Sequence, residues 1–171
     1  MEIRRLGAGE WRPLKDVRLR ALKDAPRAFS STFSEAATRT DDEWRDAADR
    51  GSRGESWVTF VADDGVSIVG MASGHFPFEA HHPIDDPALV SLIQMWVDPA
   101  LRRRGVGRRL VEAVIAWAAE RGSRVVRLGV TATETGAVAF YEALGFRDTG
   151  RRDTSIARLG PVIEMERPCR T

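Results

Sequence analysis

A short segment of the chain combines arginine with glycine in a way that suits the binding of an anion. Residues 102–109 read Arg-Arg-Arg-Gly-Val-Gly-Arg-Arg, so five arginines surround two glycines. A glycine has no side chain to keep a ligand away from the backbone, and arginine grips phosphate oxygens through paired N–H donors. If a helix begins here, its first backbone N–H groups are additional donors for an anion. The segment therefore predicts a site for a diphosphate.

Two familiar nucleotide-binding motifs do not match this segment. A dinucleotide fingerprint requires a third glycine where Leu110 stands, and an acidic residue about twenty positions further on, after a second strand, which this sequence lacks. A P-loop requires lysine and then serine or threonine after its last glycine, where the chain has Arg108 and Arg109. The arginines by themselves are also typical of a solvated helix start, so a ligand site is favoured only together with the glycines and the surrounding elements.

A second feature with chemical capacity is Tyr141, the only tyrosine of the chain. A phenol with a pKa of about 10 stays protonated at neutral pH and can donate a proton. The tyrosine lies within a predicted helix, Thr135 to Leu144, that Gly145 would end. An isolated tyrosine on such a helix is more often a packing residue, so its role depends on what lies beside it.

Strands and helices alternate along the chain and position these residues at the ends of elements. Strands are expected at 3–6, 57–62, 66–76, 89–97 and 124–131, with closing strands from 146 and at 162–166. Helices are expected from Trp11 until Pro26, from Thr40 to Gly51, from Val106 to Arg121 and from Thr135 to Leu144. The second helix has a capping box at 40–43, and the almost wholly apolar strand 89–97 is expected to be central and buried. This order predicts a mixed α/β sheet with helices on its faces.

Two stretches, together with this order of elements, resemble the GNAT superfamily of N-acetyltransferases. The first, Met95 to Leu110, is similar to the family's acetyl-CoA-binding motif, Gln/Arg-x-x-Gly-x-Gly/Ala after a strand that ends in Val-x-Pro. Arg102, Gly105 and Gly107 stand at its fixed places. The second, 137–146, is similar to the family's later helix with its Tyr-x-x-x-Gly-Phe ending. The resemblance covers roughly residues 1–167, and we expect a single GNAT domain over 1–171.

The resemblance implies a GNAT-like mixed central sheet that splays between its fourth and fifth strands, with helices on both faces. The pantetheine arm of acetyl-CoA would enter this opening and bond to the backbone of Met95 and Val97, and the diphosphate would lie on backbone amides between Arg103 and Arg108. The expected cofactor-binding residues are Met95, Trp96, Val97, Arg102, Arg103, Arg104, Gly105, Val106, Gly107 and Arg108. One position departs from the family pattern, because Glu134 stands where an asparagine often helps to hold the cofactor.

The activity that the resemblance implies is transfer of the acetyl group of acetyl-CoA to a primary amine of a small molecule or peptide. In the family, a tyrosine at the place of Tyr141 protonates the departing thiolate, and a backbone N–H, here that of Met95, stabilises the tetrahedral oxyanion. The general base stays open. The strand 91–97 carries no carboxylate, Gln94 cannot take a proton, and His75 has a suitable pKa but is more often a simple strand-end residue.

The acceptor site should be built by the first two helices and the loop 77–87. The acids Glu79, Asp85 and Asp86 in that loop would attract a cationic amine, although ordinary solvation of the loop explains each of them as well. Phe29, Phe33 and Trp44 are expected either to line the acceptor pocket or to pack in the core. No metal site is expected, because the adjacent His81 and His82 cannot readily converge on one ion.

Composition limits the classes of partner. The chain has 171 residues with 26 basic and 25 acidic side chains, and a net charge of +1 predicts neither a nucleic-acid nor a membrane partner. One cysteine, Cys169, cannot form an internal disulfide, and no apolar run or leader pattern is visible, which favours the cytoplasm. A non-catalytic acyl-CoA-binding regulatory or sensor module is the alternative, favoured by the missing strand carboxylate and opposed by Tyr141. Dimers are common among relatives, so a homodimer stays open.

Overall fold

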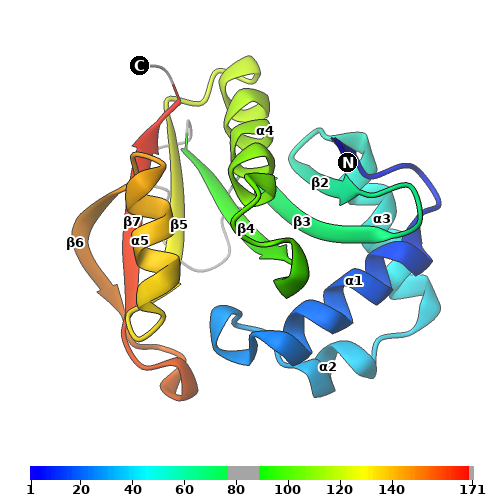
Figure 1. Ribbon diagram of the computed structural model, residues 1–171, viewed down its shortest axis with the longest axis horizontal. Helices are drawn as coiled ribbons and strands as arrows, with labels where there is room; N and C mark the ends of the chain where they lie inside the picture. Colours follow the sequence, from blue (N-terminus) through cyan, green and yellow to red (C-terminus); the bar gives the residue numbers. More distant parts are fainter. Residues whose placement is uncertain (77–88, 170–171) are drawn as a thin grey trace.

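The computed structural model describes residues 1–76 and 89–169 (Figure 1). The loop expected at 77–87, with Glu79, His81, His82, Asp85 and Asp86, lies outside the described residues. The strands are β1 (Glu2–Arg5), β2 (Trp57–Asp63), β3 (Ile68–His75), β4 (Leu89–Val97), β5 (Val125–Thr131), β6 (Arg147–Asp153) and β7 (Val162–Pro168). The helices are α1 (Trp11–Asp24), α2 (Phe33–Ala37), α3 (Asp41–Arg53), α4 (Val106–Glu120) and α5 (Thr135–Ala143), with short 3₁₀ turns η1 (Pro26–Ala28), η2 (Pro99–Leu101) and η3 (Ala157–Leu159).

The strands form one sheet in the order β1-β2-β3-β4-β5-β7-β6. Every neighbouring pair is antiparallel except β4 and β5, which pair in parallel only from Leu89↔Val125 to Ser91↔Arg127. Beyond Ser91 the two strands separate, and the sheet divides into two arms, which Figure 1 shows as β4 and β5 diverging below α4. The predicted mixed sheet, splayed between its fourth and fifth strands, is therefore confirmed.

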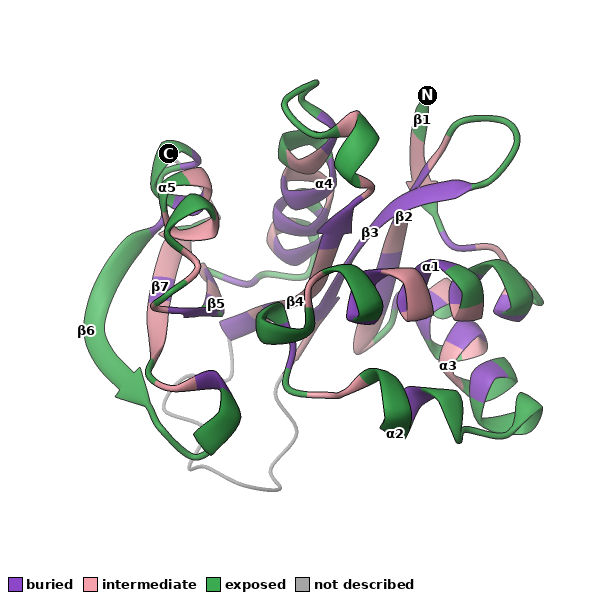
Figure 2. Ribbon diagram, turned by 60° about the horizontal axis from the view of Figure 1, so that its bottom comes forward, coloured by how far each residue is buried: buried purple, intermediate pink, exposed green. Residues whose placement is uncertain are grey.

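Two clusters of buried apolar residues pack on the sheet, one with α4 and one with α1 and α3. Strand β3 is buried along almost all its length (Figure 2), and its glycines set the distance to α4. A Cβ atom added at Gly70 would lie 3.3 Å from Leu110, and one added at Gly74 would lie 2.8 Å from Val114, so the glycines let α4 pack directly on the strand. Met71, which follows Gly70 and lies on the opposite face of the strand, belongs to the second cluster, with α1 and α3. This period of two is the ordinary alternation of a strand with helices on both sides.

A β-bulge interrupts this alternation in β4. Met71 of β3 pairs with Trp96 of β4, and Ser73 pairs with Ile93, so β4 has one more residue than β3 between the two pairs. Within this interval Gln94 adopts a left-handed conformation with φ 57°. Before the bulge, Leu92 packs in the α4 cluster, whereas after it Trp96 packs in the α1–α3 cluster. The bulge therefore reverses which side chains of β4 face α4.

Helix α3 shows how local sequence sets helix ends. Thr40 Oγ1 accepts from the backbone N–H of Glu43 at 3.2 Å, and a Glu43 carboxylate oxygen accepts from the N–H of Thr40 at 2.7 Å, which confirms the capping box. The predicted end at Gly51 is wrong, because the helix continues to Arg53 and ends at Gly54, which has φ 65°. Gly51 is instead a close-packing residue, since a Cβ there would lie 2.7 Å from Thr59 Oγ1.

In the part of the chain that the structure describes, no helix combines the length and the apolar character needed to span a bilayer.

Candidate active site

A cleft of about 1210 Å³ opens where β4 and β5 part. Its lining brings together residues far apart in the sequence: the end of β4, the loop before α4, the buried face of α5, and the inner faces of α1 and α3. Of the residues predicted from sequence, the cleft is lined by Met95, Trp96, Val97, Arg102, Arg103, Gly105, Gly107, Arg108 and Tyr141. Two are not part of this lining: Arg104 is exposed elsewhere on the loop, and Val106 is buried in the core below α4.

The backbone of β4 presents hydrogen-bonding groups to this cleft. The N–H of Asp98 donates to the carbonyl of Val69 at 2.9 Å, so Asp98 bonds toward β3. Antiparallel pairing alternates, and it therefore turns the N–H and C=O of Val97 away from β3, toward the side where β5 has diverged. The same alternation applies to Met95, because Trp96 pairs with Met71. The strand edge at Met95 and Val97 therefore faces the cleft.

A chain of side-chain hydrogen bonds holds the bulge. Thr59 and Ser73 share a hydrogen bond of 2.9 Å between their hydroxyls, and the Ser73 hydroxyl donates to Gln94 Oε1 at 3.1 Å. Thr59 and Ser73 are both buried, so this chain has little freedom. A left-handed conformation costs a non-glycine residue about 1–2 kcal/mol, which the hydrogen bond offsets in part. The bulge fixes the backbone position of Met95, directly after Gln94.

The loop before α4 leaves the first N–H groups of the helix without a cap. Gly105 is the N-cap residue at φ 78°, no side chain caps the helix, and its first turn contains no acid. Nothing lies within 4 Å of a Cβ added at Gly105, whereas one at Gly107 would lie 2.9 Å from Met95 Cε and 3.1 Å from Phe140 Cζ. Gly105 is thus required for its backbone conformation and Gly107 for close packing. The uncapped N–H groups of this first turn are suited to binding an anion.

The arginines of this loop have different surroundings. Arg102 donates from Nε to the carbonyl of Val97 at 2.9 Å and forms an ion pair with Asp24 of α1. The same Asp24 accepts from Trp96 Nε1 at 2.9 Å, so Arg102 ties the loop to β4 and α1. Among the described residues, no hydrogen bond or ion pair involves the side chains of Arg103 or Arg108. These two exposed cations remain available to a ligand at the mouth of the cleft.

Tyr141 lies on the face of α5 that lines the cleft and is only 9% exposed. Its ring packs edge-on against Phe140 at 5.1 Å and Phe146 at 5.7 Å between centroids. Burial raises the pKa of the phenol above its ordinary value, so the hydroxyl keeps its proton at neutral pH. In the described part of the chain, no group forms a hydrogen bond with this hydroxyl. Tyr141 is therefore a protonated hydroxyl donor in the lining of the cleft, with its ring held by Phe140 and Phe146.

Two other titratable residues considered from sequence have clear surroundings. His75 stacks on Trp57 at 4.8 Å, its Nδ1 lies 3.0 Å from the carbonyl of Phe76, and it is not part of the cleft lining. Burial lowers the pKa of His75. Glu134 lines the cleft at the start of α5 but is directed to Arg27, with 3.8 Å between Oε1 and Nε. Its carboxylate is therefore partly neutralised by a neighbouring element.

Sequence reasoning overlooked a charged residue on the inner face of α1. Arg18 is 6% exposed, lines the cleft, and lies in the same wall as Trp44 of α3 and Phe29. A signal for it exists, because Leu14, Val17, Ala21 and Leu22 are the buried positions of α1 and their helical spacing places residue 18 on the same face. Phe29 and Trp44, for which either a pocket or a core position was expected, pack in the α1–α3 cluster and also line the cleft, whereas Phe33 is exposed and is not part of the lining.

Similarity to known proteins agrees with this geometry. A model of the acetyltransferase (GNAT) family matches residues 19–146. N-acetyltransferase 8 of Homo sapiens is 31% identical over 96 residues, which cover 54% of this chain and 39% of that protein. The aminoglycoside N(6')-acetyltransferase type 1 of Salmonella typhimurium is 32% identical over 95 residues, covering 55% of this chain and 65% of the relative. The matched part is thus less than two thirds of the length of either relative.

Solved structures share the fold over almost the whole chain. YncA of Salmonella typhimurium, solved with its cofactor acetyl-CoA, has a TM-score of 0.79 at 18% identity and covers 100% of this chain and 95% of its own. The PaiA N-acetyltransferase of Thermoplasma acidophilum, in complex with coenzyme A, has a TM-score of 0.75 at 17% identity, with 98% of both chains covered. With the family match over most of its length and the splayed sheet of that fold, the chain belongs to the GNAT family of acetyltransferases.

Proposed function

We propose that this protein transfers the acetyl group of acetyl-CoA to a primary amine of a small molecule or peptide. The observation that carries the proposal is the cleft itself, which combines an open β4 edge, an uncapped helix N-terminus and the buried hydroxyl-bearing ring of Tyr141. Named relatives include an aminoglycoside acetyltransferase and an acetyltransferase for alanine of ribosomal protein bS18, both of which act on amines. The thioester of acetyl-CoA supplies the activated acetyl group.

The residues present suit this co-substrate. The uncapped N–H groups after Gly105 and the cations of Arg103 and Arg108 offer donors and positive charge to a diphosphate. The edge of β4 offers the N–H and C=O of Met95 and the N–H of Val97 to the amide units of a pantetheine chain, since the carbonyl of Val97 already accepts from Arg102. Arg102 is already engaged with Val97 and Asp24, so its contribution is to hold the loop against the strand.

Three tasks are required for the transfer, and this chain offers residues for two of them. The backbone N–H of Met95, fixed by the Gln94 bulge, stabilises the oxyanion that forms when the amine attacks. Tyr141 gives a proton to the departing sulfur, because burial keeps its phenol protonated. The third task is removal of the proton of the amine. The cleft-lining carboxylates of the described residues are Glu134 and Asp153, and an amine that arrives neutral or passes its proton to water needs neither.

The decisive variant is Tyr141→Phe, measured as release of free thiol from acetyl-CoA with a panel of primary amines. The ring still packs between Phe140 and Phe146, so acetyl-CoA should bind to the variant with wild-type affinity in calorimetry. Turnover should fall by roughly 10²–10⁴-fold, the range of a lost general acid, and mainly in kcat.

Phe140→Leu is a matched control, because it alters packing next to Tyr141 without removing a hydroxyl. An unchanged kcat for Tyr141→Phe would refute the acid role. If wild-type protein binds acetyl-CoA but acetylates no amine of a broad panel, the alternative of a non-catalytic acyl-CoA sensor replaces the enzyme.

A further inference from the structure

The wall of the cleft opposite the expected cofactor site contains a buried cation that the mechanism above does not use. We infer that the acceptor amine also carries an oxyanion, a carboxylate or a phosphate, which binds to Arg18 of α1 and Trp44 of α3. The inference rests on the proposed function, since it names the class of amine that the same cleft accepts.

The first observation is a pair of hydrogen-bond donors without acceptors. Among the described residues, two buried side-chain polar atoms have no hydrogen-bond partner: Arg18 Nη1 and Trp44 Nε1. Both are donors, both belong to residues at least nine-tenths buried, and both residues line the cleft. Buried polar groups in native proteins are almost always satisfied, so two unsatisfied donors in one wall indicate a missing acceptor. Oxygen atoms of a ligand in the cleft would supply acceptors for these donors.

The second observation is charge. Arg18 lies against the face of Phe29, with 4.5 Å from Cζ to the ring centroid, and has no carboxylate partner in the described part of the chain. Burial, assisted by the charge of Arg39, lowers the pKa of Arg18 to about 10, which still leaves the side chain positively charged at neutral pH. A buried charge without a counter-ion is costly. An anionic ligand would remove that cost, whereas a neutral one would only satisfy the donors.

The surrounding wall has the same sign. Arg39 stacks over Trp44 at 5.3 Å and Arg50 over Trp57 at 4.6 Å, and both arginines line the cleft. Of the cleft-lining carboxylates in the described ranges, Glu134 faces Arg27 and Asp153 belongs to β6 in the other arm. The α1–α3 wall is therefore cationic, and it would repel a polyamine or any acceptor with only positive charge. An amino acid or a phosphorylated amine carries a negative group, its carboxylate or phosphate, that this cationic wall would attract.

The test compares acceptors in pairs that share an amine but differ in the anion. We would measure kcat/KM with amino acids against their carboxamides, and with phosphoethanolamine against ethanolamine. The variants are Arg18→Met, which keeps length and contact with Phe29, and Arg12→Met as the matched control. Arg12 lies on the same helix, packs on Trp11 at 4.4 Å and is not part of the cleft lining.

Wild type should prefer the anionic member of at least one pair by about 10–100-fold, the value of a hydrogen bond to a charged group. Preference within the amino-acid pairs identifies a carboxylate, and preference within the ethanolamine pair identifies a phosphate. Arg18→Met should abolish the preference mainly through KM, leave the neutral members within about threefold, and leave acetyl-CoA binding unchanged, while Arg12→Met behaves as wild type.

A separate binding measurement distinguishes failure of this inference from failure of the proposed function. The same anionic amines are titrated into protein saturated with coenzyme A, which cannot transfer an acetyl group. Binding that disappears in Arg18→Met supports the anion site even if no amine is ever acetylated. Equal turnover of anionic and neutral amines by wild type, or equal losses for both in Arg18→Met, would overturn the inference while leaving the acetyltransferase intact. Absence of Arg18-dependent binding and of any anion preference would also overturn it.

Discussion

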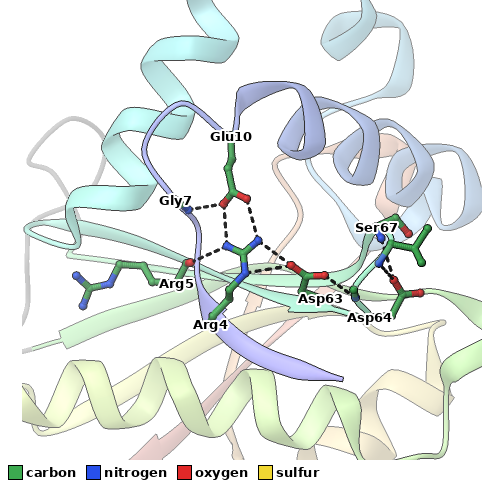
Figure 3. A network of polar contacts seen from close by, with 9 residues as sticks. Arg4, Arg5, Gly7, Glu10, Asp63, Asp64 and Ser67 are labelled. Carbon is green, nitrogen blue, oxygen red and sulfur yellow. Dashed lines mark hydrogen bonds and ion pairs between the residues drawn. The ribbon is translucent and has the colours of Figure 1, made fainter.

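Two arginines near the start of the chain have opposite surroundings. Arg4, on β1, is at the centre of a network that Figure 3 shows: its guanidinium donates to Glu10 at 2.8 Å and to Asp63 at 2.8 Å, and also to the carbonyl of Arg5. Arg18, on α1, is more deeply buried than Arg4 yet has an Nη1 atom without any acceptor. The more exposed arginine has the more complete set of partners.

This difference in partners distinguishes Arg4, whose charge has a structural role, from Arg18, whose charge is suited to binding a ligand. Arg4 joins the start of α1 to the end of β2, and Glu10 also accepts from the N–H of Gly7 at 2.5 Å, so the network closes within the chain. Arg18 is buried in the wall of the cleft, and its Nη1 has no acceptor in the described part of the chain to offset the loss of hydration. We therefore expect replacement of Arg4 to lower the free energy of unfolding, and replacement of Arg18 to leave it unchanged or to raise it.

The largest expected effect on stability is that of Arg4→Met. The change leaves Glu10 and Asp63 without their shared cation, and both carboxylates are only partly exposed. We expect unfolding free energy to fall by about 1–2 kcal/mol, less than for a fully buried pair because solvent screens the site. For a chain of this size that corresponds to a fall in Tm of about 2–8 °C, measurable by calorimetry.

Arg12→Met serves as the comparison here too, since Arg12 is exposed and, among the described residues, its recorded side-chain contact is the stacking on Trp11. Its stability should stay within about 0.5 kcal/mol of wild type. Equal losses for Arg4→Met and Arg12→Met would mean that the network of Figure 3 contributes no more than an ordinary surface side chain.

The contrast between these arginines also marks what sequence can reveal. Local patterns predicted the capping box at Thr40 and the bounds of β4 at Leu89 and Val97, because capping and apolar runs are encoded by adjacent residues. The resemblance to the GNAT family predicted the splayed sheet, which the parallel pairing limited to Leu89–Ser91 confirms. These features need no knowledge of distant contacts.

Features that depend on distant residues could not be predicted in the same way. The bulge at Gln94 is held by a hydrogen bond from Ser73 of the neighbouring strand, and β4 contains no glycine that would have indicated a bulge in the sequence. Arg102 was expected among the cofactor-binding residues, and its ion pair with Asp24 could not be predicted because the two residues are 78 positions apart in the sequence. Helical spacing alone places Arg18 on a buried face, but whether any carboxylate meets it there is decided by tertiary packing.

A smaller effect, of opposite sign, is expected for Arg18→Met in the absence of ligands. Methionine fills similar space and keeps a favourable contact with the ring of Phe29, while the unpaired buried charge disappears. Unfolding free energy should stay equal to that of wild type or rise by up to about 1 kcal/mol, as measured by urea denaturation. A loss of more than about 1 kcal/mol would show that Arg18 contributes to the core and would weaken the contrast with Arg4.

The smallest effect is a pH dependence that should appear at Arg4 and not at Arg18. The hydrogen bond from Arg4 lowers the pKa of Glu10, and the backbone N–H of Gly65, followed by Arg4, lowers the pKa of Asp63. A carboxyl group whose pKa is lowered by folding stabilises the native state above its unfolded pKa, and this contribution is lost as pH falls through the lower native value. The stability gap between wild type and Arg4→Met should therefore be constant from pH 6 to 8 and shrink below about pH 4.

Arg18 provides the internal comparison for that titration. In the described part of the chain, the charge that acts on the pKa of Arg18 is that of Arg39, and no carboxylate pairs with Arg18. The stability difference between wild type and Arg18→Met should consequently keep the same value between pH 7 and about pH 3.5, where that of Arg4→Met declines. Urea unfolding of the three proteins at four pH values measures both gaps in one series. If the Arg4 gap persisted unchanged to pH 3.5, its source would be packing of the side chain rather than its two ion pairs. If the stability difference for Arg18→Met changed with the same pH midpoint as that for Arg4→Met, a carboxylate would be paired with Arg18 in solution. The cation in the cleft wall would then already have a partner, which would contradict its role as a binding site for an anionic ligand.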